Sequence, residues 1–459
     1  MTVLRDIAQA LQQGETTSTE LVTTAFERID TDPALEHVMI QDYRDQALQQ
    51  ATAADELRAK DPGALAPFAG IPITIKDLFD IAGQSTTAGS VALQHAPPAV
   101  RTAPCIQALI DAGFIPLGRV NMTEFAYSGL GLNPHHGTPR NPCDKSAARI
   151  PGGSSSGSAV SVATGLVAAS IGSDTGGSVR IPAALCGLTG FKPGSTRISR
   201  EGVVPLSTTL DTIGPLANSV QCCADLYHVM SGQPALVLEG RALAGVRLIV
   251  PENVVWERCE QSVRQRFDDA LNQLKGQGVE VIRQPVELID AVMGSGVQGV
   301  FAGYEAFQWH QSLLQQAGGE DMADYDPRVR VRIETGGEIP SQAYRNAAAL
   351  LQELRQTFAT ALESNTLFAW PTTARTAPLF SELESEAGYS DQNLLLLRNT
   401  AIGNVLDAAS ITLPLPASVN CSNAADSEGL PAGLMLSVPA GSESELLAVA
   451  QAAQHALVG

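Results

Sequence analysis

The sequence predicts an α/β protein in which helices cover both faces of a mixed β-sheet. Short apolar segments typical of strands alternate with amphipathic segments typical of helices along most of the 459 residues. The clearest example is a strand at 245–250, a helix at 261–277 and a second strand at 279–283, which indicate a β–α–β unit. No linker, internal repeat or low-complexity segment interrupts the chain. We therefore expect residues 1–459 to form a single domain with a large core.

Composition excludes several classes of protein. Apolar residues make up 44% of the chain and charged residues 17%, as in ordinary globular proteins. A net charge of −19 leaves no basic surplus for nucleic acid or an anionic membrane. There is no run of 18 apolar residues and no apolar core of a signal peptide, so we expect a cytoplasmic location.

Seven cysteines are scattered along the chain without a CxxC spacing, which indicates free thiols and neither a disulfide framework nor a zinc site. They are Cys105, Cys143, Cys186, Cys222, Cys223, Cys259 and Cys421. His135 and His136 are adjacent, so their side chains diverge, and no acidic residue stands beside them in the sequence. We therefore expect a loop there, with no metal bound and no cofactor required.

Residues 1–60 are predicted to form a helical arm. Apolar residues at helical spacing predict a helix at 3–13, and Thr17 provides an N-cap for a second helix through Ile29. A short strand at 37–40 and a helix at 44–60 complete this arm.

The next elements lead to a lysine and to a candidate binding loop. An apolar strand at 71–75 ends at Lys76, and a helix at 103–112 precedes a strand at 114–117. Residues 121–129, NMTEFAYSG, follow this strand.

Two glycine–serine turns, at 152–154 and 176–178, flank a small-residue apolar run at 159–171. Glycines of this kind let the backbone approach a ligand and present its N–H groups to an anion. A P-loop needs a lysine followed by Ser or Thr after its glycines, and none stands there, which argues against a phosphate-binding P-loop. The buried run between the turns excludes a flexible linker. Backbone donors for the oxyanion of acyl transfer are the remaining interpretation.

The segments GGSS, GSDTGGSVRIPA and GLTGFKP, which lie between Arg149 and Pro193, resemble the amidase signature family of serine hydrolases. The resemblance implies the amidase signature fold, an α/β/α sandwich, with a core at 61–230. It also implies a triad of Ser178 as nucleophile, Ser154 as a bridging serine after a cis peptide bond, and Lys76 as base. The spacing 178 − 154 = 24 agrees with the family.

The chemistry of these residues supports the implied roles. A serine hydroxyl needs a base, and none of the seven histidines lies in a catalytic motif. Burial disfavours the charged form of a lysine, so Lys76 is a suitable substitute. We expect the amides of Thr175, Gly176, Gly177 and Ser178 to bind the oxyanion.

The flanking residues Asp174 and Arg180 are interpreted as a buried pair, with a substrate clamp by Arg180 as the lesser alternative. By resemblance, the backbone of Tyr127, Ser128 and Gly129 lines the acyl pocket.

The resemblance weakens over 232–365, which we expect to be mostly helical and to form a variable lid. His310, Arg328 and Trp309 are candidates there, as is Trp370 further on, although packing is the favoured role of both tryptophans.

The resemblance returns over 366–459, where the family pattern predicts late strands at 367–373 and 429–436 and a final helix at 443–457. We expect a helix and a turn at 403–414.

The expected function is hydrolysis of a small-molecule carboxamide, without nucleic acid or membrane as a partner. One alternative is the A component of a glutamine-dependent aminoacyl-tRNA amidotransferase, and another is a urethane or ureido hydrolase with the same triad. The resemblance also allows a homodimer formed through the N-terminal arm.

Overall fold

A computed structural model describes residues 3–236, 238–252, 254–317, 322–415 and 429–458. Eleven strands form one mixed sheet in the order β1-β3-β2-β4-β6-β5-β10-β11-β9-β7-β8. The strands are β1 (Met39–Asp42), β2 (Pro72–Lys76), β3 (Ile115–Val120), β4 (Ala169–Asp174), β5 (Thr189–Lys192), β6 (Thr212–Ala217), β7 (Arg247–Pro251), β8 (Glu280–Gln284), β9 (Thr366–Pro371), β10 (Ala409–Pro414) and β11 (Gly433–Val438).

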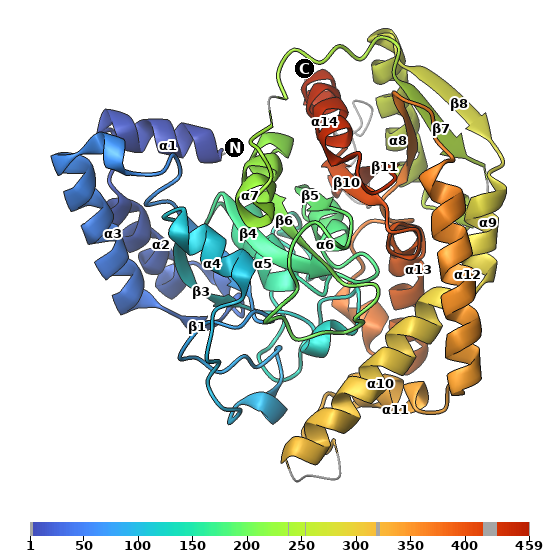
Figure 1. The fold of residues 1–459 in the computed structure, drawn as a ribbon, viewed down its shortest axis with the longest axis horizontal. Coiled ribbons are helices and arrows are strands. Elements are labelled where there is room, and N and C mark those ends of the chain that lie inside the picture. Colours follow the sequence, from blue (N-terminus) through green and yellow to red (C-terminus); the bar gives the residue numbers. More distant parts are fainter. Residues whose placement is uncertain (1–2, 237, 253, 318–321, 416–428, 459) are drawn as a thin grey trace.

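Helices cover both faces of the sheet, as predicted (Figure 1). The helices are α1 (Leu4–Gln13), α2 (Ser18–Thr31), α3 (Arg44–Lys60), α4 (Pro104–Asp111), α5 (Ser156–Ala163), α6 (Arg180–Leu185), α7 (Val220–Ser231), α8 (Gln261–Gly276), α9 (Glu287–Gly294), α10 (Val297–Ala317), α11 (Pro327–Gly336), α12 (Ser341–Ala359), α13 (Glu386–Val405) and α14 (Glu443–Val458). Helices α4, α7, α8 and α14 pack together on one face, and α5, α6, α13, α9 and α12 pack on the other.

The sheet is parallel where β-α-β connections build it and antiparallel elsewhere. Strand β2 pairs in parallel with β3 and β4, and β7 pairs in parallel with β8 and β9. The unit β7-α8-β8 confirms the β–α–β prediction. Because β2 and β4 run side by side in the same direction, Lys76 and Asp174 at their C-terminal ends lie at the same edge of the sheet.

One predicted element is wrong. Residues 403–414 are not a helix and a turn, because α13 extends from Glu386 to Val405 and β10 then runs from Ala409 to Pro414 in the middle of the sheet. Nearly all of β10 is buried, so its side chains lack the alternation that identifies a half-exposed strand.

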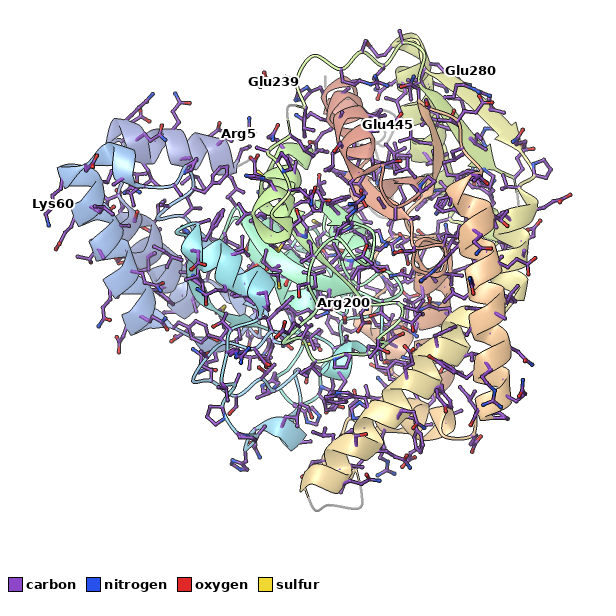
Figure 2. All side chains as sticks on the ribbon, viewed as in Figure 1. Arg5, Lys60, Arg200, Glu239, Glu280 and Glu445 are labelled. Atoms are coloured by element: carbon purple, nitrogen blue, oxygen red, sulfur yellow. The ribbon has the colours of Figure 1, made fainter. Side chains whose placement is uncertain are left out.

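Side chains fill the spaces between the sheet and its two helical layers, and charged side chains such as Lys60 and Glu280 lie at the periphery (Figure 2). Within the described residues, no helix is long and apolar enough to cross a membrane.

Candidate active site

Lys76, the last residue of β2, is completely buried at the C-terminal end of its strand. Its Nζ donates hydrogen bonds to Ser154 Oγ at 2.7 Å and to Ser173 Oγ at 2.9 Å. Burial lowers the pKa of Lys76 to about 7, against the opposing effect of the negative charges on Asp211 and Asp174. A large fraction of this lysine is therefore neutral near pH 7 and able to accept a proton.

Ser154 follows a cis peptide bond from Gly153, as the resemblance implies. Close backbone contacts surround this turn: the Gly153 amide donates to the Gly129 carbonyl at 2.9 Å, and the Thr123 amide donates to the Ser154 carbonyl at 3.1 Å. A Cβ atom on Gly153 would lie 2.5 Å from the Gly131 nitrogen, so only glycine fits. The loop at 123–131 thus holds the Ser154 hydroxyl against Lys76.

Ser173, the second acceptor of the lysine, is a residue that the sequence analysis missed. It precedes the last residue of β4 and is only 4% exposed. The sequence placed it in the motif GSDTGGSVRIPA but gave no sign of its contact with Lys76. That contact arises because β4 pairs in parallel with β2, and parallel neighbours that end together bring their last side chains into reach.

The segment between Asp174 and Arg180 forms a rigid loop. Arg180 Nη2 lies 2.8 Å from Asp174 Oδ1, and both side chains are fully buried. Asp174 Oδ2 also accepts the amides of Val179 and Arg180 at 3.1 and 3.3 Å. Burial alone would raise the pKa of Asp174, but the Arg180 guanidinium lowers it to about 2. This confirms the interpretation of a buried pair. Because Arg180 is paired with Asp174, its guanidinium is not free to clamp a substrate.

The backbone of this loop is oriented by side chains from two helices. Thr400 Oγ1, on α13, donates to the Gly176 carbonyl at 2.6 Å, and Gln298 Nε2, on α10, donates to the Thr175 carbonyl at 3.0 Å. Within the described part of the chain, the amides of Gly176, Gly177 and Ser178 donate no hydrogen bond. Unpaired amides beside a cavity are the donors that an oxyanion requires.

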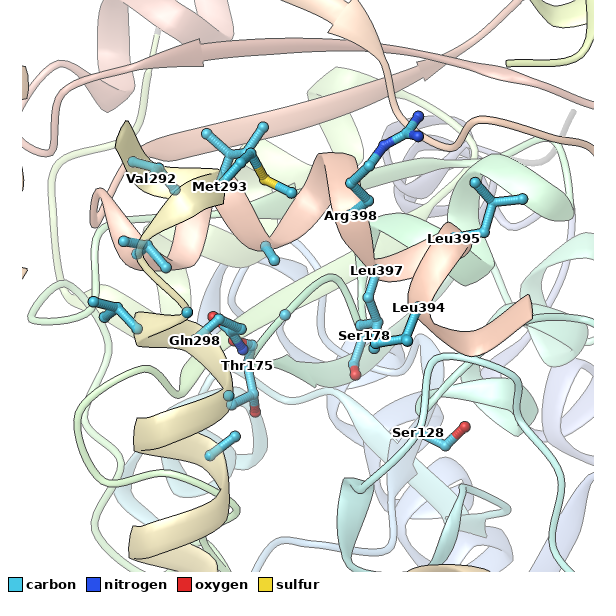
Figure 3. A pocket seen from close by; sticks show the side chains of 18 of the residues that line it. Ser128, Thr175, Ser178, Val292, Met293, Gln298, Leu394, Leu395, Leu397 and Arg398 are labelled. Carbon is cyan, nitrogen blue, oxygen red and sulfur yellow. The ribbon is translucent and has the colours of Figure 1, made fainter. Parts of the chain in front are cut away.

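Ser178 lies on the wall of a cavity of about 520 Å³ (Figure 3). The Ser155 amide donates to the Ser178 carbonyl at 3.3 Å, so the two glycine–serine turns are in contact. Among the described residues, hydrogen bonds link Lys76 to Ser154, but none links the hydroxyls of Ser154 and Ser178. Catalytic hydrogen bonds of this kind are often completed only when substrate is bound.

The cavity is largely apolar, and most of its wall was not predicted. Helices α9 and α13 provide Val292, Met293, Leu394, Leu395 and Leu397 (Figure 3). Helix α10 provides Val297. Tyr127 and Ser128 line the cavity, as does Thr175. Gly129 is not among the described lining residues, and its amide instead donates to Asn393 Oδ1 at 2.8 Å.

Arg332, on α11, also lines the cavity. Its Nη1 donates to the Tyr127 carbonyl, and its guanidinium lies 4.6 Å from the centre of the Tyr127 ring. Among the described residues, no carboxylate lies within ion-pair distance of Arg332.

The candidates named in the 232–365 region and at Trp370 lie outside this cavity wall. His310 is buried, shares a hydrogen bond of 2.9 Å with the Tyr325 hydroxyl, and burial lowers its pKa to about 3. Trp309 packs near Phe125, and Trp370 is 1% exposed in the core, which confirms packing for both tryptophans.

Arg328 stacks 4.5 Å above the Tyr389 ring and pairs with Glu386. Arg328 therefore joins α11 to α13.

In the described part of the chain, no group of three or more potential metal ligands comes together. The fold does bring an acidic partner to His135, whose Nε2 lies 2.9 Å from Glu124 Oε1, although none is near it in the sequence. The six cysteines within the described residues are free thiols, and Cys421 lies outside them.

Comparisons with known proteins agree with this architecture. A family model described as Amidase matches residues 20–447. The 2-amino-5-chloromuconic acid deaminase of Comamonas testosteroni is 31% identical over 99% of this chain and 97% of its own. The A component of the glutamyl-tRNA(Gln) amidotransferase of Cupriavidus necator is 34% identical over 78% of each chain. A crystal structure of an amidase superposes with a TM-score of 0.87 and 30% identity, covering 99% of this chain and 100% of that one.

Proposed function

This chain belongs to the Amidase family, and on that premise we propose that it hydrolyses the C–N bond of a small carboxamide through an acyl-enzyme on Ser178. One observation carries the proposal. A fully buried lysine with a pKa of about 7 lies 2.7 Å from one serine hydroxyl, in a turn that contacts the turn of a second, cavity-facing serine. Such an arrangement can activate a hydroxyl without histidine.

In the first half of the reaction, Ser178 Oγ attacks the substrate carbonyl carbon while its proton passes through Ser154 to neutral Lys76. The amides of residues 175–178 stabilise the oxyanion. The lysine then returns the proton, again through Ser154, to the leaving nitrogen, and the C–N bond breaks. Water next hydrolyses the ester on Ser178 and releases the acid.

The cavity supports a small substrate with an apolar body. Its walls are largely aliphatic, and its volume of about 520 Å³ is in the range of small-molecule sites. Arg332 adds a positive charge that no described carboxylate neutralises, which favours substrates that carry an acidic group.

A component of a glutamine-dependent amidotransferase is the second candidate, because the Cupriavidus necator protein is 34% identical over most of both chains. Turnover of simple amides by the purified chain alone supports the hydrolase, whereas turnover confined to glutamine supports the second candidate. Urethanes and ureas belong in the same substrate panel, since the acyl mechanism accepts several leaving groups.

The test of the mechanism is covalent labelling of the purified chain with a fluorophosphonate, followed by mass spectrometry of its peptides. We expect the label on Ser178, and we expect Ser178→Ala to lose both labelling and amide turnover. Ser312→Ala removes an exposed serine on α10 and serves as the matched control, with both signals retained. Turnover by Ser178→Ala at the rate of the unaltered protein refutes the proposal.

A further inference from the structure

A second cavity, of about 270 Å³, adjoins the first one. Ala126, Thr175 and Leu206 line both cavities, so these residues form a shared neck. The second cavity has about half the volume of the first, which suits water and other small polar molecules better than the acyl part of a substrate.

The inner end of the second cavity is formed by Ser173, which is hydrogen-bonded to the proposed base Lys76. Ser173 lines this cavity, and its Oγ accepts the hydrogen bond from Lys76 Nζ at 2.9 Å. No described group accepts a hydrogen bond from the Ser173 hydroxyl itself, so its hydrogen is available to a molecule in the cavity. The cavity therefore lies one hydroxyl away from the proposed base.

The outer end of the second cavity reaches the surface. Its lining includes Arg200, Val203 and Val204, which are half-buried, and Thr208, which is exposed. Figure 2 shows Arg200 on the loop that crosses this side of the molecule. The cavity thus extends from the exposed Thr208 to Ser173 and meets the first cavity at the shared neck.

Polar groups line the second cavity near the neck that it shares with the first cavity. Asp211 lines the second cavity, and its carboxylate accepts a hydrogen bond of 2.5 Å from Thr175 Oγ1 at the neck. The same carboxylate accepts the amides of Leu206 and Ser207 at 3.0 and 3.1 Å, which holds the neck in place. A water molecule needs two to four polar partners, and the hydroxyls of Ser173, Thr175 and the Asp211 carboxylate can supply them.

We propose that the second cavity supplies the water that hydrolyses the acyl-enzyme. This inference rests on the proposed function. An acyl group in the first cavity occupies the path that the substrate used, whereas the second cavity stays open and ends at Ser173, one hydroxyl away from the base. The water oxygen bonds to the acyl carbon while one of its protons passes through Ser154 to Lys76. The bond from that carbon to Ser178 Oγ then breaks, the proton returns to Ser178 Oγ, and the carboxylic acid leaves.

The test separates acylation from deacylation with p-nitrophenyl hexanoate, whose acyl chain is long enough to occupy the first cavity; its burst of nitrophenol reports acylation and its steady state reports deacylation. The variant Val204→Phe places a larger side chain in the wall of the second cavity only. We expect the burst rate to stay within about 2-fold of the unaltered protein and deacylation to fall about 10-fold. Val100→Phe makes the same change at a side chain that is 92% exposed and should alter neither rate.

A second variant, Thr208→Trp, obstructs the exposed rim, where a bulky side chain does not disturb the core. It should also slow deacylation selectively, and it decides the question if Val204→Phe does not fold. Unchanged deacylation in a folded variant, or equal slowing of both steps, overturns the inference. A missing burst in the unaltered protein, together with an unlabelled Ser178, refutes the proposed function instead.

Discussion

The pH dependence of activity follows from the burial of Lys76. In the proposed mechanism the lysine acts as base only when it is neutral, and its pKa of about 7 lies below the ordinary value of 10.5 because burial disfavours its charge. Its neutral fraction is then about one tenth at pH 6, one half at pH 7 and nine tenths at pH 8. Raising the pH from 6 to 8 should therefore increase kcat/KM about 10-fold, with a midpoint close to neutrality.

The assay is release of ammonia from a neutral amide, chosen so that substrate ionisation does not contribute, and measured at constant ionic strength. Lys76→Met keeps the volume of the side chain and removes the titrating group, and its residual rate should show no such midpoint. A midpoint above pH 9, as for an ordinary ammonium, refutes the role of burial. A flat profile for the unaltered protein refutes the role of Lys76 as base.

The same shift of the pKa predicts how stability changes with pH. Since the folded-state pKa of Lys76 is below the unfolded one, the folded state binds fewer protons between about pH 7 and pH 10.5. The destabilising effect of Lys76 is complete below pH 7 and is lost as the pH rises through this window. The difference in unfolding free energy between Lys76→Met and the unaltered protein, from urea titrations, should therefore shrink from pH 7 to pH 10.

Three further substitutions test the loop around the proposed nucleophile. Gly177→Ala should lower kcat at least 100-fold in amide assays, because its Cβ would lie 2.1 Å from Thr400 Oγ1 and the amide donors would shift. Asp174→Asn should lower the unfolding free energy by about 3 kcal/mol in urea titrations, since it leaves the Arg180 charge buried without its partner. Ser173→Ala removes one acceptor from the lysine, and we expect kcat to fall about 10-fold with a shifted pH midpoint.

The ends of several helices were well predicted, because the residues that cap or end a helix lie at those ends in the sequence. Thr17 caps α2 through the Glu20 amide, as its position indicated. Ser219 caps α7, and Gly14 ends α1 in a left-handed conformation. Strand β10 was missed because nearly all of its residues are buried. The apolar run that results does not distinguish a strand from a helix.

Some residues of the candidate site were predicted and others were missed, because only some of them carry a local signal in the sequence. Lys76, Ser154 and Ser178 stood out because each belongs to a short motif, and the motifs resemble a known family. Ser173 belongs to the same motif but became a candidate only when β4 was found beside β2.

The amino-acid sequence alone was enough to identify the glycines that allow two tight turns, the serines that follow them and the lysine that ends an apolar strand. Only the tertiary structure decided that this lysine is desolvated, that the turns are in contact, and that α9, α10 and α13 enclose the first cavity. The physical reason is that pKa shifts and cavity walls depend on groups distant in the chain, and their positions follow from packing, for which no local pattern exists.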